Sequence, residues 1–182
     1  NMNACTRTQD RPEGDGSLES EVAGNKSAAI ALWLVWECIV HGVYVSLEHP
    51  LTSRLWKLPF VSYVLEHCGL FCVDFDQCAY GKRPSDWQPS DGDVRVLKAS
   101  RILTNNHRLK GLAKRCFDVE KHTHQPVIGK GTDGQSRSTA AAAYPRAFAC
   151  RFASLVRMGW TRRERTTPSK RPTLTLAQLQ QN

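Results

Sequence analysis

Apolar residues along the middle of the chain recur with two different periods, which predict strands and helices in turn. Short runs rich in Val, Phe and Tyr predict strands at 43–48, 70–76 and 94–105. Runs with a helical period, bounded by capping residues and glycines, predict helices at 27–41, 52–68, 107–116 and 138–156. This alternation is typical of an α/β protein.

Prolines refine these boundaries. Pro50 cannot donate a hydrogen bond to a neighbouring strand, so we expect the first strand to end near Glu48 and to present this carboxylate at a strand-to-loop junction. Pro59 and Pro145 fall inside helical runs, and each should kink its helix or divide it in two. Thr52 or Ser53 is placed to cap the helix that follows.

The polarity of the chain suggests three parts. Residues 1–26 are polar and lack periodicity, and we expect them to be disordered. Residues 27–156 carry the predicted elements, and 157–182 form a basic segment that we also expect to be disordered. Three strands are fewer than the about four to six of a usual sheet. We therefore expect 27–156 to be a partial, Rossmann-like half-domain with an irregular, polar stretch at 117–137.

The composition of the chain indicates the compartment in which we expect the protein. The chain has 182 residues, a net charge of +8 and seven cysteines, with no secretory signal. We expect reduced thiols in an intracellular protein, cytoplasmic or nuclear rather than secreted. The apolar stretch 28–47 is long enough to cross a membrane, but Glu37, His41 and Gly42 interrupt it. A buried helix followed by a buried strand explains this stretch better.

Four short motifs occur in a fixed order: "LEHP" at 47–50, "SRLWKLPF" at 53–60, "DQCAYG" at 76–81 and "KASRILTN" at 98–105. Over about residues 24–156, this order resembles the C-terminal half of DNA cytosine-5 methyltransferase-like domains. The variant in question occurs in phage methylases and in copia-type retrotransposon polyproteins of dinoflagellates and algae. The resemblance implies a fragment whose N-terminal half-domain, or the rest of a polyprotein, is missing.

The resemblance also implies a role for Glu48. In active enzymes the matching glutamate contacts the flipped cytosine and promotes attack at C6. Active enzymes follow this glutamate with asparagine, whereas this chain has His49. The chain contains no Pro-Cys pair for the nucleophile and no Gly-rich turn after a first strand for S-adenosylmethionine. We therefore expect a vestigial Glu48, no cofactor binding and no catalysis by this chain alone.

The parallel crossover of such a domain predicts that strands 43–48 and 70–76 are adjacent and parallel. Glu48 would then share one edge of the sheet with Asp76 and Gln77.

Basic residues offer a second, non-catalytic function, which is nucleic-acid binding. Lys98 and Arg101 lie in the "KASRILTN" motif, where the family carries residues that reach the substrate backbone. Further basic residues on the predicted helix 107–116 and in the segment 157–165 form a plausible phosphate-binding surface. The six candidates before residue 157 are Lys98, Arg101, Arg108, Lys110, Lys114 and Arg115. The alternative is that these charges only face solvent.

Cys116, His122 and His124 form a C-x5-H-x-H pattern of residues that bind zinc. A closed zinc site needs four ligands, and the fourth would have to come from Cys78 or Cys150. The alternative is a buried thiol beside surface histidines. A third hypothesis, which requires zinc binding, is that the protein is a small zinc-dependent interaction domain.

Overall fold

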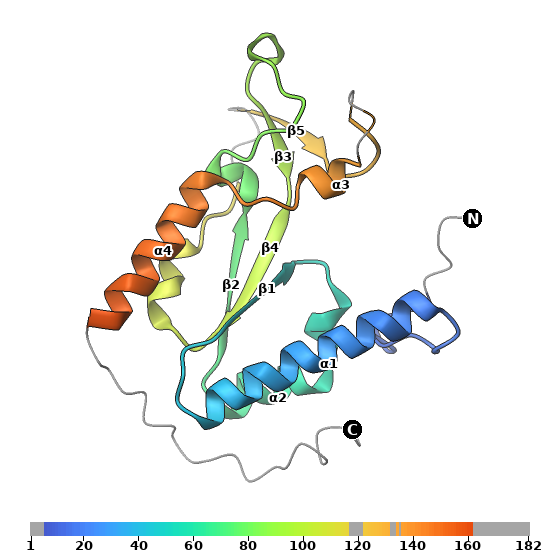
Figure 1. Cartoon of the computed structure of the whole chain (residues 1–182), viewed down its shortest axis with the longest axis vertical. Helices are drawn as coiled ribbons and strands as arrows, with labels where there is room; N and C mark the ends of the chain where they lie inside the picture. The colour runs from blue at the N-terminus through green and yellow to red at the C-terminus, as the bar shows by residue number, and fades with distance from the viewer. Residues whose placement is uncertain (1–5, 117–121, 132–133, 135, 162–182) are drawn as a thin grey trace. The chain divides into compact units, whose positions relative to one another are not determined.

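The computed structural model describes residues 6–116, 122–131, 134 and 136–161, and Figure 1 shows their arrangement in helices and strands. The helices are α1 (Glu19–Val40), α2 (Pro59–His67), α3 (Arg137–Ala140) and α4 (Arg146–Thr161). The strands are β1 (Ser46–Pro50), β2 (Phe71–Asp76), β3 (Val94–Leu97), β4 (Ala99–Thr104) and β5 (Thr123–Pro126). Short 3-10 helices are η1 (Arg54–Lys57), η2 (Gln77–Tyr80), η3 (Pro89–Asp91) and η4 (His107–Leu112).

The strands form two small sheets, in keeping with the expected α/β class. One sheet has the order β1-β4-β2, and the other pairs β3 with β5 in parallel, with Val94 opposite Thr123. The chain divides into two compact units. Among the described residues, unit 1 contains 6–72 and 103–106, and unit 2 contains 73–102 and 107–161. No described helix is both long and apolar enough to cross a membrane.

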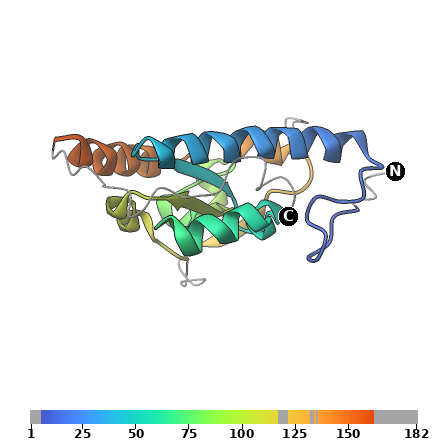
Figure 2. The ribbon, with the colours of Figure 1, turned by 90° about the horizontal axis from the view of Figure 1, so that it is seen from below.

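Unit 1 is organised around a core to which α1, α2 and the end of β4 contribute. Figure 2 shows α1 and α2 on opposite sides of β1. The buried side chains of this core are Leu32, Val35, Ile39, Trp56, Val61, Val64, Leu70 and Leu103. Side chains three and four positions apart lie on the same face of a helix, so Leu32, Val35 and Ile39 together bury one face of α1.

The prolines act as predicted from the sequence. Pro59 is the first residue of α2 and separates it from η1, so the predicted helix 52–68 is two short helices. The side chain of Ser53 accepts a hydrogen bond from the backbone N–H of Leu55 and caps η1. Pro145 likewise lies between α3 and α4 and divides the helix predicted at 138–156.

The first helix is longer than predicted and begins at Glu19 rather than near Ser27. Glu21 is buried, and its carboxylate accepts hydrogen bonds from the backbone N–H and the hydroxyl of Thr6. Arg7 donates to the carbonyl of Glu21 and to Asn25. These contacts hold residues 6–18 against the start of α1, within a segment whose polarity predicted no regular structure.

The prediction that the first two strands are adjacent is wrong, because β4 lies between β1 and β2. β4 is the most buried of the three strands, with Ser100, Ile102, Leu103 and Thr104 at 1% exposure or less. A strand buried in this way takes the central position, where both edges are paired. β1, whose residues are half-buried or exposed, lies at the edge.

Four other predicted segments also differ from the structure. The run 94–105 is two strands in different sheets, β3 and β4, with Lys98 between them. The predicted α-helix 107–116 is the 3-10 helix η4, which ends at Leu112 because Lys114 pairs with Phe75 in a parallel bridge. The stretch 117–137 contains β5, and α4 extends to Thr161. Residues 162–182 of the predicted basic tail lie outside the described residues.

Candidate metal centre

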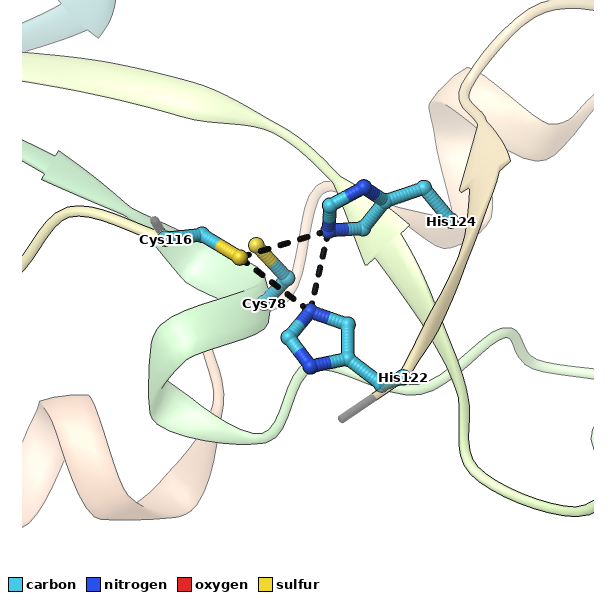
Figure 3. Close-up of side chains that lie close together, drawn as sticks. All are labelled: Cys78, Cys116, His122 and His124. Atoms are coloured by element: carbon cyan, nitrogen blue, oxygen red, sulfur yellow. Dashed lines mark hydrogen bonds between the residues drawn. The ribbon is translucent and has the colours of Figure 1, made fainter. Parts of the chain in front are cut away.

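Four side chains with metal-binding atoms converge in unit 2: Cys78, Cys116, His122 and His124. One ligand atom from each lies within 4.8 Å of all the others. The Cys116 sulfur is 3.3 Å from Nε2 of His122 and 3.5 Å from Nε2 of His124, and the two Nε2 atoms are 2.9 Å apart. Figure 3 shows both sulfurs and both rings directed toward a common point.

Cys78 reaches this point because β2 runs directly into η2. Phe75 and Asp76 are buried at the end of the strand, and Cys78 follows in the first turn of η2 with no exposed surface. Gly81 then adopts a φ of +78°, a conformation that favours glycine, and ends η2 in a tight turn.

Asp76 places the second cysteine. Its buried carboxylate accepts a hydrogen bond from the backbone N–H of Cys116 at 2.8 Å and another from Nε of Arg115 at 3.0 Å. The backbone N–H of Asp76 donates to the carbonyl of Lys114 at 2.9 Å. These three bonds fix the chain before Cys116 against the end of β2.

The two histidines come from the start of β5 and the residue before it. His124 lies opposite Arg95 in the parallel β3-β5 pairing. Arg95 donates to the backbone carbonyl of Cys78 at 3.0 Å and forms two hydrogen bonds with the carboxylate of Asp93. The β3 strand therefore connects both sides of the cluster, the η2 backbone and the histidine-bearing strand. His122 is buried, with 7% of its surface exposed.

The electrostatics fit a site that exchanges protons for a metal ion. Burial, followed by the hydrogen bond with the Cys116 thiol, raises the pKa of Cys78 to about 12. The Cys78 thiol is therefore neutral at physiological pH when the cluster is metal-free. Thiolate is the form that binds metal, so metal binding would release this proton.

The donor set also fits zinc in size and chemistry. Two thiols and two imidazoles are a common set for structural zinc. With Zn–S near 2.3 Å and Zn–N near 2.05 Å, tetrahedral ligand atoms lie about 3.3–3.8 Å apart. The expected distance is about 3.6 Å for a sulfur and a nitrogen and about 3.3 Å for two nitrogens. The sulfur–nitrogen distances of 3.3 and 3.5 Å lie close to the first value, and the nitrogen–nitrogen distance of 2.9 Å is shorter than the second.

The sequence left two candidates for the fourth ligand, Cys78 and Cys150, and the structure distinguishes them. Cys78 belongs to the cluster, whereas Cys150 lies exposed on α4 and is not part of it. Cys116, His122 and His124 come together as the C-x5-H-x-H pattern suggested.

Glu48 lies inside β1 rather than at its end, because the strand continues through His49 to Pro50. The ring of His49 packs edge-on against Trp56, and this partial desolvation lowers the pKa of His49 although the residue stays exposed. The expected common edge of Glu48 with Asp76 and Gln77 rested on adjacent strands, which the structure does not have.

The predicted phosphate-binding residues divide into two groups. Three bind within the protein: Lys98 to the carbonyl of Ala141, Arg101 through two bonds to Asp74, and Arg115 to Asp76. Arg108 and Lys110 lie on η4, and Lys114 follows it with its Nζ 5.4 Å over the ring of Tyr80; each of the three has contacts within the protein, and Lys110 and Lys114 are also exposed.

Sequence patterns did not indicate the supporting residues Asp76 and Arg95. Asp76 stands in the "DQCAYG" motif but interacts with a segment about forty residues away, and no local spacing marks that contact. The charge pair of Arg95 with Asp93 is visible in the sequence, but its bond to the Cys78 carbonyl is not.

Comparison with known proteins leaves the geometry as the main guide to function. No family model, curated protein or solved structure matches this chain.

Proposed function

We propose that this protein is a zinc-binding module whose metal ion stabilises unit 2 and does not take part in catalysis. The observation that carries the proposal is the convergence of Cys78, Cys116, His122 and His124 within 4.8 Å. Four protein ligands close a zinc site, whereas a catalytic zinc keeps a position for water or substrate. The bound ion would supply cross-linking of chain segments.

The positions of the ligands explain why this cross-link would matter. The site would join η2, the chain after η4 and the β5 segment. β3 and β5 form only a two-stranded sheet, which is marginal on its own. A metal that binds the folded chain stabilises it by about 4 kcal/mol when free metal exceeds Kd a thousandfold.

The test is metal content together with thermal stability. Protein purified with added zinc should contain one zinc per chain by elemental analysis, and Co²⁺ in its place should give the intense visible bands of tetrahedral cobalt with thiolate ligands. Removal of metal with a chelator should lower Tm.

The variants Cys116→Ser and His124→Asn should lose the metal and the chelator effect. Cys150→Ser, a cysteine outside the cluster, should keep both. Equal metal content in Cys116→Ser and Cys150→Ser would refute the proposal.

We also propose, from the sequence resemblance, that the fold is a Rossmann-like half of a methyltransferase-like domain. The α/β class and the position of α1 and α2 on opposite sides of β1 support this proposal, whereas the position of β4 between β1 and β2 departs from the adjacent strands that the resemblance implied. Because the Pro-Cys loop and the Gly-rich turn are absent, the chain should neither bind S-adenosylmethionine nor methylate cytosine. Isothermal titration with the cofactor and methyl transfer to cytosine-containing DNA test this, and saturable binding or turnover would contradict it.

Nucleic-acid binding is another candidate function, favoured by the net charge of +8 and by the exposed side chains of Lys110 and Lys114. Binding through phosphates should weaken steeply with salt, and Lys110→Glu with Lys114→Glu should weaken it further. Arg101→Gln serves as the matched control, because its guanidinium is already bound to Asp74. Fluorescence anisotropy with labelled DNA and RNA measures this, and binding that is absent at low salt or insensitive to salt would exclude the candidate.

A further inference from the structure

Helix α1 has an apolar stripe that faces away from its own core. Ile30, Trp33 and Leu34 are 62%, 43% and 51% exposed, and Val40 continues the stripe at 36%. The spacing of three and four residues places these side chains on one face, opposite to the face buried by Leu32, Val35 and Ile39. Figure 2 shows the outer side of α1 turned away from α2.

The exposed stripe follows a heptad pattern that includes two charges. Ala23, Ile30 and Glu37 recur every seven residues, and Lys26, Trp33 and Val40 form the second series between them. Residues 6–18 do not cover the stripe, since Arg7 contacts Glu21 and Asn25 on another face of the helix. A helix of 22 residues is about 33 Å long, enough for an extended helix-to-helix contact.

The charges specify the occupant and its direction. When two copies of α1 pack antiparallel about a two-fold axis between residues 31 and 32, residue i faces residue 63 − i of the other copy. Lys26 then faces Glu37, Ile30 faces Trp33, and the small Ala23 faces Val40. In a parallel pairing in register, Lys26 would face Lys26 and Glu37 would face Glu37, which is repulsive.

We propose that the outer face of α1 is a homodimer interface, in which α1 packs antiparallel against α1 of a second copy of this chain. Each of the two symmetry-related ends contains one pair between Lys26 and Glu37. The Glu37 carboxylate also lies 3.5 Å from Nε2 of His41, the residue that follows α1. The proposal is independent of the metal centre, which lies entirely in unit 2.

The test begins with the mass of the zinc-supplemented full chain by sedimentation velocity, between about 1 and 100 µM. A dimer is expected within this range. Trp33→Glu should make the protein monomeric, and Ile128→Glu, a change at a 79% exposed apolar residue of unit 2, should not. Circular dichroism of both variants confirms that they remain folded. A monomer at every concentration, or equal dimerisation of both variants, would overturn the proposal.

Charge reversal and cross-linking then test the direction of packing. Lys26→Glu and Glu37→Lys should each raise the dimer Kd by about tenfold, and the double variant should restore it. A carbodiimide should join Lys26 of one copy to Glu37 of the other. Within one helix these residues are about 16 Å apart along the axis, too far for a direct amide bond. A double variant weaker than both single variants, or a dimer without this cross-link, would contradict the antiparallel arrangement.

Discussion

Replacement of Asp76 by alanine tests whether the metal centre depends on a carboxylate that does not bind the metal. Asp76 is 4% exposed, and one of its oxygens accepts from both the Cys116 backbone and Arg115. The variant Asp76→Ala removes this acceptor and leaves the N–H of Cys116 without its partner. The Cys116 thiol then loses its fixed position relative to Cys78.

The expected loss of stability in Asp76→Ala follows from the two hydrogen bonds that Asp76 accepts. A buried N–H that loses its acceptor costs about 1–3 kcal/mol. The side chain of Arg115 is 36% exposed, so its ion pair with Asp76 is screened and contributes about 0.2–1 kcal/mol. The free energy of unfolding should therefore fall by about 1–4 kcal/mol, toward the lower end because the bond to Cys116 is only partly buried. Loss of a residue that orients a metal ligand lowers metal affinity by about 10–100-fold, and we expect the lower end of this range.

Urea unfolding and competition for zinc with a chromophoric chelator measure the two effects. The matched control is Asp74→Ala, which removes the two bonds to Arg101 and a 4.0 Å ion pair with Arg115, and leaves the bond from Asp76 to Cys116 in place. This control should lose some stability and keep its zinc affinity. Equal zinc affinities of Asp76→Ala and the wild type, with fully folded protein, would refute the role assigned to Asp76.

Three further predictions follow from other contacts. In metal-free protein, mild oxidation should form a disulfide between Cys78 and Cys116, because their sulfurs lie within 4.8 Å of each other, and bound zinc should prevent this reaction. Peptide mapping measures the disulfide, and finding neither the disulfide nor protection by zinc would contradict the geometry. Phe148→Ala should lower the free energy of unfolding by about 3–5 kcal/mol, because the Phe148 ring is 5% exposed and stacks on Phe75 with ring centroids 4.4 Å apart. Thermal or urea unfolding measures this loss, and a value below about 1 kcal/mol would contradict the packing. Partial desolvation lowers the pKa of His49 below its value in the unfolded chain, so the unfolded state binds more protons and stability should fall as pH drops below about 6.5. Urea midpoints measured from pH 7.5 to 5 should fall less in His49→Gln, and identical profiles would contradict the lowered pKa of His49.

Local chemistry in the sequence determined the features that depend on neighbouring residues. Pro59 and Pro145 divide helices because a proline ring and its missing N–H act on its own turn, and Ser53 caps η1 across two residues. The apolar periods indicated the α/β class and most strands for the same reason. The pattern of Cys116, His122 and His124 indicated a possible metal site, because these three ligands are close in sequence.

Tertiary structure decided the features that depend on residues far apart in the chain. The central position of β4 follows from burial on both sides, which no local pattern separates from the burial of β2. The residue pattern of 107–116 predicts an amphipathic helix, but the helix ends at Leu112 because Lys114 pairs with Phe75 in a β-bridge. The choice of Cys78 over Cys150 as the fourth ligand rests on Asp76, which holds the Cys116 segment at the end of β2. Long-range hydrogen bonds and burial, which no spacing of residues encodes, therefore completed the metal centre.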